Sequence, residues 1–594
     1  VRRSREMETV GFLPFDYIVF ASVFLGSLGI GVFYAWKGSK SNAEFLMANR
    51  SMGVLPVSFS LMASYLSSIM LLGIPAEVYG HGVEILVLFM GMFSGMLVAT
   101  RVFIPILFRL QLTSVYEYLE IRFKSKPIRW VSSLTFIVQM VLYMSIVLYA
   151  PTLSLQPVTD LPQWVVIIIT GTLCTAYTTF GGLKAVVWTD VFQVIIMFLG
   201  VITIVFFGFS LIGGFNKTLE LALPAGRINL FNMTLDPFQR HSFWLLFFSH
   251  LQQWLSTYGC TQTQVQRYCS MKNETDPNKA MSITIPALAV LGVFLILLGL
   301  ILFGLYSQCD PYLAGKISKT DEIFPYFVFT ELASIPGIRG LFIASLFSGS
   351  LSTLSSGLNS LAAVCWEDFL KDLNCFSILA EKHCTWITKG LACSFGVLVI
   401  GLACLANKLG GLIQATGTIN GMVNGPLGGV FWLALLFPFV NGKGALIGII
   451  FGHAVTIWIS VGGAIHKSSP QILETKLLNC SFDIDYSSTV PTIQSEDIPV
   501  EVAGFNSLYH LSYLLYPIIG CLVTVVVGVV VSLFTGCMTF DIEDKDLMFP
   551  FAWNLYKKYA ANISPNKITS DYPLHDLKTY MKKGESTDTL ATEI

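Results

Sequence analysis

A run of hydroxyl side chains interrupts one apolar stretch, residues 338–363. Within it, in the sequence GSLSTLSSG, Ser352 and Thr353 follow Gly349 by three and four residues. On a helix this spacing presents one backbone carbonyl and two hydroxyls to a point beside the helix. Neutral oxygens of this kind suit a weakly held Na⁺, because Mg²⁺ and Ca²⁺ favour more carboxylates. The alternative is that the hydroxyls only bond back to their own helix.

Two further apolar stretches contain enough polar and small residues to predict broken helices. Residues 55–76 include SFSLMASYLSSIMLLG, with five serines, and residues 242–262 place Gly259 among Thr and Gln in STYGCTQTQ. Non-helical backbone at membrane depth survives only where it lines a cavity or is buried in protein. Broken helices at matching positions of two halves indicate a transporter binding site. The alternative is that small residues simply let helices pack closely.

Few ionisable residues lie in the apolar stretches. Asp190, in VVWTDVFQ, stands at the start of one of them and is a candidate for attracting or releasing a cation. The histidines show no sequence pairing with a nucleophile or a carboxylate cluster, and no G-x-S-x-G or Walker-type loop occurs. We therefore expect neither an enzyme nor ATP as a fuel. These histidines are His81, His241, His250, His453 and His510.

The composition is that of a polytopic membrane protein. Of 594 residues, 54% are hydrophobic, and only 12% are charged, about half the share of a soluble domain. The net charge of −1 gives nucleic-acid binding no electrostatic basis. With roughly 20 apolar residues needed per span, we predict thirteen bilayer-spanning helices, at 17–35, 55–76, 84–108, 130–155, 163–180, 191–213, 242–262, 281–308, 338–363, 386–406, 410–438, 444–464 and 511–537.

Charge placement predicts the orientation of the chain. The basic connections 37–54 and 109–129 should be cytoplasmic, so residues 1–14 lie outside and the tail 538–594 inside. Glycosylation sequons at Asn216, Asn232 and Asn479 then fall outside, whereas those at Asn273 and Asn562 fall inside and should stay bare. Cys309 and Cys480 lie in long outside loops, where a disulfide between them could persist.

Several motifs resemble the sodium:solute symporter family from about residue 12 to residue 540. They include LGIPAEVYGHG, LTSVYEYLEIRF, GGLKAVVWTDVFQ, YGCTQTQVQRY and LFSGSLSTLSSGLNSLAAVCWEDFL. The chain is most similar to the branch of sodium-dependent multivitamin, sodium-coupled monocarboxylate and sodium/iodide transporters. The resemblance implies an all-α, leucine-transporter-type fold with two inverted five-helix repeats. The repeats would cover 55–213 and 242–438, with one helix and loop before them (15–54) and two helices after them (444–537) around an outside loop, 465–510.

The resemblance also implies site residues. The family's conserved sodium site would use the carbonyls of Ala63, Leu66 and Gly349 and the hydroxyls of Ser352 and Thr353, with Asp190 nearby. A second sodium in some branch members is held by polar groups that match Ser64, Ser67, Gln193 and Gln262. The substrate pocket would be lined by Met70, Tyr143, Trp254, Gly417 and Asn420. Met70, Gly417 and Asn420 depart from the relatives, so the sodium site is conserved better than the pocket.

These observations predict a Na⁺-coupled symporter for a small organic anion. An apolar wall at Met70 and open room at Gly417 favour a vitamin-like carboxylate, such as biotin or pantothenate, over smaller acids. The alternatives are transport of another monocarboxylate, iodide or a sugar, or a sensor or channel that does not concentrate its ligand. We expect the plasma membrane as the location. The terminal Thr592, Glu593 and Ile594 could bind a PDZ domain, although chance better accounts for so short a motif.

Overall fold

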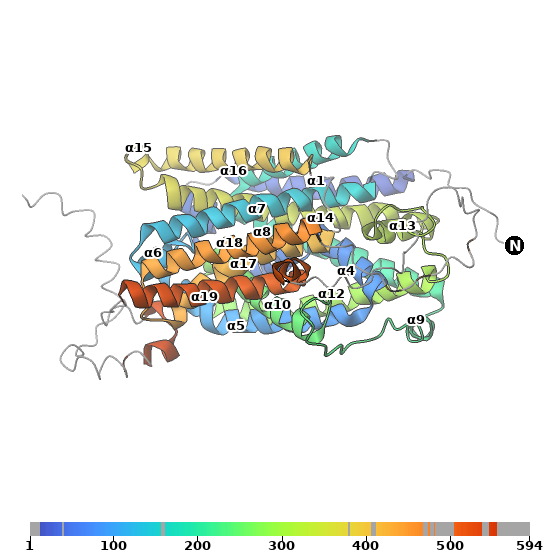
Figure 1. Ribbon diagram of the computed structural model, residues 1–594. Coiled ribbons are helices and arrows are strands. Elements are labelled where there is room, and N and C mark those ends of the chain that lie inside the picture. Colours follow the sequence, from blue (N-terminus) through green and yellow to red (C-terminus); the bar gives the residue numbers. More distant parts are fainter. Residues whose placement is uncertain are drawn as a thin grey trace, which may run out of the picture.

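The computed structural model describes residues 12–38, 41–155, 161–377, 380–405, 412–466, 473, 475, 480, 504–536, 546–554 and 557. Within these residues the chain is helical, and its one β-type pairing is an isolated bridge between Met52 and Met271. Long helices run side by side (Figure 1), with α9 and α13 at the end where the N-terminus lies and α6 and α15 at the opposite end.

The long helices follow the predicted spans. Their bounds are α1 Pro14–Lys37, α3 Val54–Tyr65, α4 Ser68–His81, α5 Leu86–Leu110, α7 Lys126–Leu155, α8 Gln163–Ile212, α10 Phe243–Cys260, α11 Gln262–Cys269, α12 Asp276–Tyr306, α14 Ile338–Cys365, α16 Glu381–Ala403, α17 Leu412–Leu436, α18 Gly442–His466 and α19 Tyr516–Thr535. Shorter helices connect them, including α2 Asn42–Met47, α6 Glu117–Phe123, α9 Phe215–Ala222, α13 Ile323–Thr330, α15 Asn374–Ser377 and the 3₁₀ turn η8 Tyr513–Leu515.

The number of spans agrees with the prediction once two features are considered. Ten of the described helices are long and apolar enough to cross a membrane, and α3 with α4, bent by 54°, makes an eleventh span. Helix α8 has 50 residues, about 75 Å at 1.5 Å per residue, which is more than twice the bilayer core. It therefore counts as two spans. The 18-residue α10 is too polar for the same test, yet it occupies the position of the seventh predicted span.

Glycine allows α8 to change direction. Gly182 adopts φ 62° and ψ −165°, a backbone conformation that side-chain-bearing residues rarely adopt. A Cβ there would also lie 2.7 Å from the ring of Phe45 on α2. The sequence placed a loop at this point, between spans ending at 180 and starting at 191, and the structure shows a kink without a loop.

Both predicted helix breaks occur, one of them at a different residue. Helix α3 ends at Tyr65 and α4 starts at Ser68, as the serine-rich stretch predicted. In the seventh span the break is at Thr261, with φ −91° and ψ 127°, and not at Gly259. Gly259 remains helical and serves close packing, because a Cβ there would lie 2.8 Å from the ring of Phe103.

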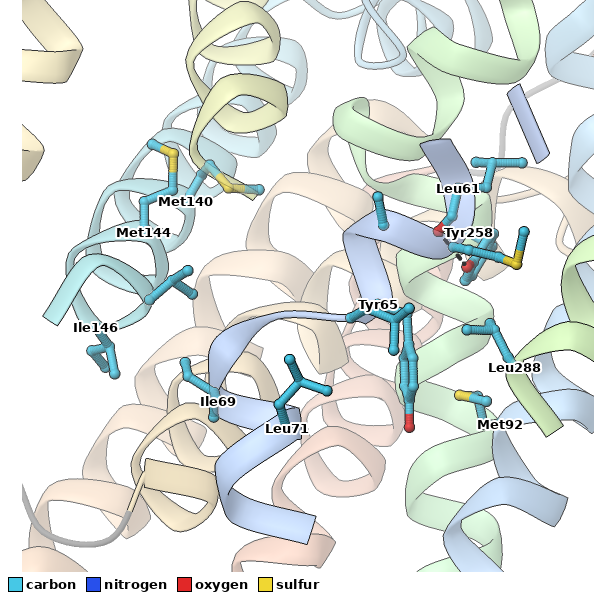
Figure 2. Packing of buried hydrophobic residues seen from close by; sticks show 14 of the residues in the cluster. Leu61, Tyr65, Ile69, Leu71, Met92, Met140, Met144, Ile146, Tyr258 and Leu288 are labelled. Atoms are coloured by element: carbon cyan, nitrogen blue, oxygen red, sulfur yellow. Dashed lines mark hydrogen bonds between the residues drawn. The ribbon is translucent and has the colours of Figure 1, made fainter. Parts of the chain in front are cut away.

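The two broken helices contact each other beside their breaks. The hydroxyl of Tyr258 on α10 donates to the carbonyl of Leu61 on α3 at 3.4 Å, as Figure 2 shows. The rings of Tyr65 and Trp254 lie 5.1 Å apart between centroids. The two points where regular hydrogen bonding stops therefore lie close together within the buried core.

Candidate functional site

The break between α3 and α4 redirects backbone hydrogen bonds. The N–H of Ser67, which an unbroken helix would give to Ala63, bonds instead to the carbonyl of Tyr65 at 2.8 Å. The N–H of Met70 bonds to Ser67 and not to Leu66. The carbonyls of Ala63 and Leu66 therefore lose their helical donors and are available to another partner.

Helix α14 brings its hydroxyls to these carbonyls. Ser352 donates to the carbonyl of Ala63 at 3.1 Å and to that of Gly349 at 3.1 Å, and Thr353 donates to Gly349 at 3.0 Å. The approach requires glycine, because a Cβ at Gly349 would lie 2.8 Å from the carbonyl oxygen of Leu66. The structure thus gathers all five predicted sodium oxygens where α14 crosses the break.

Both interpretations of these hydroxyls find support in the geometry. Each bonds back to Gly349 on its own helix, and Ser352 also bonds across to α3. Both side chains are buried. A bound Na⁺ would take the oxygens of Ala63, Gly349, Ser352 and Thr353 together, with the hydroxyl protons rotated away. A donor set of carbonyls and hydroxyls without a carboxylate fits a monovalent ion held at moderate strength.

Asp190 lies nearby, but its carboxylate is already paired. One oxygen accepts from Ser60 at 2.5 Å and from the guanidinium of Arg267 at 3.1 Å. Arg267 also donates to Ser64 and Ser356, so it links α3 and α14 beside the sodium oxygens. Arg267 was not among the predicted site residues, although an arginine in the polar run TQTQVQRY was a signal. The other carboxylate oxygen of Asp190 is buried without a partner among the described residues, so the role of Asp190 near a cation stays a prediction.

The four residues predicted for a second sodium bond mostly to other partners in this structure. Gln193 donates to Ser27 on α1 at 3.4 Å. Gln262 donates to the carbonyl of Thr113 at 2.6 Å and accepts from the N–H of Val115 at 2.8 Å, which anchors the loop after α5. Ser64 accepts from Arg267, and both Ser64 and Ser67 line the central cavity. A second sodium site that uses these four residues stays a prediction.

A cavity of about 140 Å³ lies beside the break in α3 and α4. Thr353 and Ser67 line it, so it adjoins the sodium oxygens. No Lys, Arg, Asp or Glu is among its described lining residues. All five residues predicted for the substrate pocket line this cavity: Met70, Tyr143, Trp254, Gly417 and Asn420.

One pocket residue, Gly417, differs from its predicted role. A Cβ on Gly417 would lie 3.0 Å from the ring of Tyr513 on η8, so that ring fills the room that we expected beside the glycine. Asn420 accepts from the amide of Gln139 at 3.0 Å. By contrast, the buried indole N–H of Trp254 has no acceptor among the described residues and can donate to a ligand. Tyr513 lies 96 residues after Gly417, so its position next to α17 carried no sequence signal.

A charged cluster missed by the sequence analysis lies near the cavity. Arg240 contacts Glu77 through Nε at 2.9 Å and Nη2 at 3.2 Å. His81 and His241 lie 3.2 and 3.3 Å from the same carboxylate. The expectation that no histidine pairs with a carboxylate was therefore wrong for these two. His81 lies one turn after Glu77 on α4, whereas His241 is distant from it in sequence.

The predicted disulfide and sequons lie in or next to described segments. Cys309 and Cys480 are joined in a disulfide, with 5.1 Å between their Cα atoms. Asn216 is exposed on α9, and Asn232 lies in the connection before α10. Asn479, Asn562 and the terminal Thr592–Ile594 lie outside the described residues.

Comparison with known proteins identifies the family. The sodium:solute symporter family matches residues 45–452. The chain belongs to the sodium:solute symporter family. The symporter is 40% identical over 532 residues to the human sodium-coupled monocarboxylate transporter 2, covering 89% of this chain and 85% of the relative. It is 39% identical to the mouse sodium-coupled monocarboxylate transporter 1 (90% of each) and 38% identical to the rabbit sodium-dependent multivitamin transporter (89% and 84%).

The relatives and a solved structure confirm the fold and class of this symporter. A Na⁺-coupled sialic acid symporter aligns with a TM-score of 0.73 at 23% identity, covering 89% of this chain and all of the other. This likeness confirms the fold, an all-helical membrane protein of the leucine-transporter type. The relatives are transporters and not enzymes, and Na⁺ is the coupling ion.

Proposed function

We propose that this symporter imports a small organic monocarboxylate, driven by the inward Na⁺ gradient. The observation that carries the proposal is a cavity whose described lining has no charged side chain and which directly adjoins the sodium oxygens. A Na⁺ ion bound between α3 and α14 would therefore supply positive charge next to the substrate. Substrate and ion would then stabilise each other's binding, which is the basis of coupling.

The helix breaks add a second source of positive potential. Helix α4 starts at Ser68 and α11 at Gln262, and residues at both starts line the cavity. The N-terminus of a helix carries partial positive charge and N–H groups without helical acceptors. In transporters, half-helix ends of this kind point at anionic substrate groups. A sugar would need many directed hydrogen bonds instead, and the cavity offers few, chiefly from Tyr143, Trp254 and Asn420.

The filled space beside Gly417 bears on substrate size. A vitamin-like carboxylate was favoured because Gly417 should leave room, and Tyr513 occupies that room. Sequence identity does not separate the two substrate classes. The chain is 40% identical to a sodium-coupled monocarboxylate transporter and 38% identical to a sodium-dependent multivitamin transporter. We therefore favour a compact monocarboxylate and treat biotin and pantothenate as the alternative.

An uptake panel tests this function. Cells that express the symporter should accumulate labelled lactate or nicotinate in Na⁺ medium and lose this uptake when Na⁺ is replaced by choline. Biotin and pantothenate should be weaker substrates, and iodide and glucose should not compete. Robust Na⁺-coupled glucose uptake that no carboxylate inhibits would refute the substrate class and leave the fold standing.

We also propose a plasma-membrane location with the N-terminus outside and the tail inside. Asn216, Asn232 and Asn479 should then be the glycan acceptors, and their joint replacement by Gln should give the mobility of enzymatically deglycosylated protein. Asn232 should carry more glycan than Asn216, because the sequon hydroxyl of Thr218 is buried and donates to Gly214 at 3.2 Å. A glycan that persists at Asn273 or Asn562 would invert this orientation.

A further inference from the structure

Arg240 lies beside the cavity, and three residues next to it in space or in sequence line that cavity. Its sequence neighbour His241 lines the cavity, as does Tyr513, whose ring centroid lies 5.6 Å beneath the guanidinium. Nη1 of Arg240 donates to Gln414 at 3.0 Å, and the adjacent Ile413 on α17 lines the cavity as well. Its backbone is fixed too, because the carbonyl of Arg240 accepts from Ser512 at 3.1 Å.

The hydrogen bonds of Arg240 leave part of its guanidinium available. A guanidinium has five N–H donors. The Glu77 carboxylate accepts one hydrogen bond from Nε and one from Nη2, and the side-chain oxygen of Gln414 accepts one from Nη1. Within the described part of the chain, one donor on each terminal nitrogen therefore remains without an acceptor. Two parallel N–H donors on one guanidinium form the fork that binds a carboxylate in bidentate fashion.

Glu77 holds Arg240 in place and at the same time weakens its field. The Glu77 side chain is 9% exposed and that of Arg240 19%, so the pair is mostly shielded from water. Two imidazoles, from His81 and His241, also border the Glu77 carboxylate. That carboxylate would consequently keep polar partners if Arg240 shifted toward an incoming anion. Such an arrangement lets the arginine bind an anion reversibly, where a bare buried cation would hold it too tightly.

We propose that Arg240 forms an anion site at the outer rim of the cavity, where the carboxylate of the substrate binds before it enters the central pocket. Glu77 is a positioning residue for this site, and its charge limits the affinity so that the substrate can move on. The central pocket lacks a cation, so Arg240 selects carboxylates over neutral analogues of the same shape. The site rests on the proposed import of a monocarboxylate and on the orientation given above.

The test measures uptake kinetics in Arg240→Gln, Arg240→Lys and Glu77→Gln, using the monocarboxylate from the panel that gives the greatest uptake. Arg240→Gln should raise the KM for the carboxylate about tenfold or more, because a charge-assisted bidentate contact is lost. The Na⁺ concentration for half-maximal uptake should stay unchanged. Arg240→Lys should recover part of the affinity, since it keeps the charge without the fork. Glu77→Gln should instead lower the KM and slow turnover.

Two further measurements separate recognition from a structural role. The primary amide of the same acid is used as a competitor of uptake. In the wild type the amide should inhibit uptake much more weakly than the acid, whereas in Arg240→Gln the two should inhibit about equally. Lys217→Gln, which changes an exposed cation paired with Glu220 at 2.8 Å, controls for surface potential and should alter nothing. The double variant Glu77→Gln/Arg240→Gln removes both charges, so it should fold even if Arg240→Gln alone does not. Its KM for the carboxylate should be raised as much as that expected for Arg240→Gln.

The outcomes are distinct for the site and for the function. Equal KM values in wild type and Arg240→Gln, or equal rises in KM for both single variants, would refute the anion site while the import of monocarboxylates stands. A wild-type protein that takes up no monocarboxylate would overturn the proposed function and, with it, this site.

Discussion

Replacing Ser352 and Thr353 together by alanine is expected to raise the Na⁺ concentration for half-maximal transport by about a hundredfold or more. Each substitution removes one oxygen from the cluster with Ala63 and Gly349. A lost ligand to a desolvated charge costs about 1.5–3 kcal/mol, and each 1.4 kcal/mol corresponds to a factor of ten. The measurement is Na⁺-dependent uptake at fixed substrate, with surface expression determined in parallel.

Two variants on the same helix provide the controls. Thr353→Ser keeps the oxygen and should retain most of the apparent Na⁺ affinity. Ser345→Ala removes a hydroxyl that donates to Leu341 at 2.8 Å, two turns before Ser352, and should leave Na⁺ dependence unchanged. Wild-type Na⁺ dependence in the double alanine variant would place the coupling site elsewhere.

Arg267→Met is expected to destabilise the symporter by about 3–5 kcal/mol, because it leaves the carboxylate of Asp190 buried without its cation. The side chains of Arg267 and Asp190 are 1% and 0% exposed, so water cannot replace the lost partner. Thermal unfolding in detergent and the yield of monodisperse protein report this loss. The double variant Arg267→Met/Asp190→Asn should recover much of the stability, since no unpaired charge remains.

A more exposed ion pair supplies the comparison for this prediction. Lys184 contacts Glu44 at 2.6 Å, with 28% and 18% of the two side chains exposed. Lys184→Met should cost about 1 kcal/mol or less, as is usual for pairs that water can reach. Equal losses in Arg267→Met and Lys184→Met, or no recovery in the double variant, would show that the buried pair contributes little.

Features that depend on local sequence were predictable. Long uncharged stretches define the spans, and small or polar residues marked both helix breaks. The spacing of Gly349, Ser352 and Thr353 placed three oxygens on one face of a helix before any contact was known. The resemblance to relatives added Ala63 and Leu66, whose backbone carbonyls carry no side-chain signal of their own.

Features that depend on tertiary pairing were not predictable. Asp190 and Arg267 are 77 residues apart, and Glu77 and Arg240 are 163 apart, so no local pattern connects them. The contact of Tyr513 with Gly417 likewise reverses the inference about pocket size, because a glycine shows only that space is needed and not what fills it. The exact residue of the second break, Thr261, was not predictable either, and the nearby Gly259 serves packing against Phe103 instead.

The central claim, that a Na⁺ site between α3 and α14 drives carboxylate import, is tested most directly with purified protein in liposomes. Labelled Na⁺ and labelled monocarboxylate are followed together after an inward Na⁺ gradient is imposed. We expect the carboxylate to accumulate above its external concentration, in a fixed ratio to Na⁺ entry, and the Ser352→Ala/Thr353→Ala variant to lose both fluxes at the same Na⁺ concentration. Carboxylate that merely equilibrates at the same rate with and without Na⁺ would contradict the account.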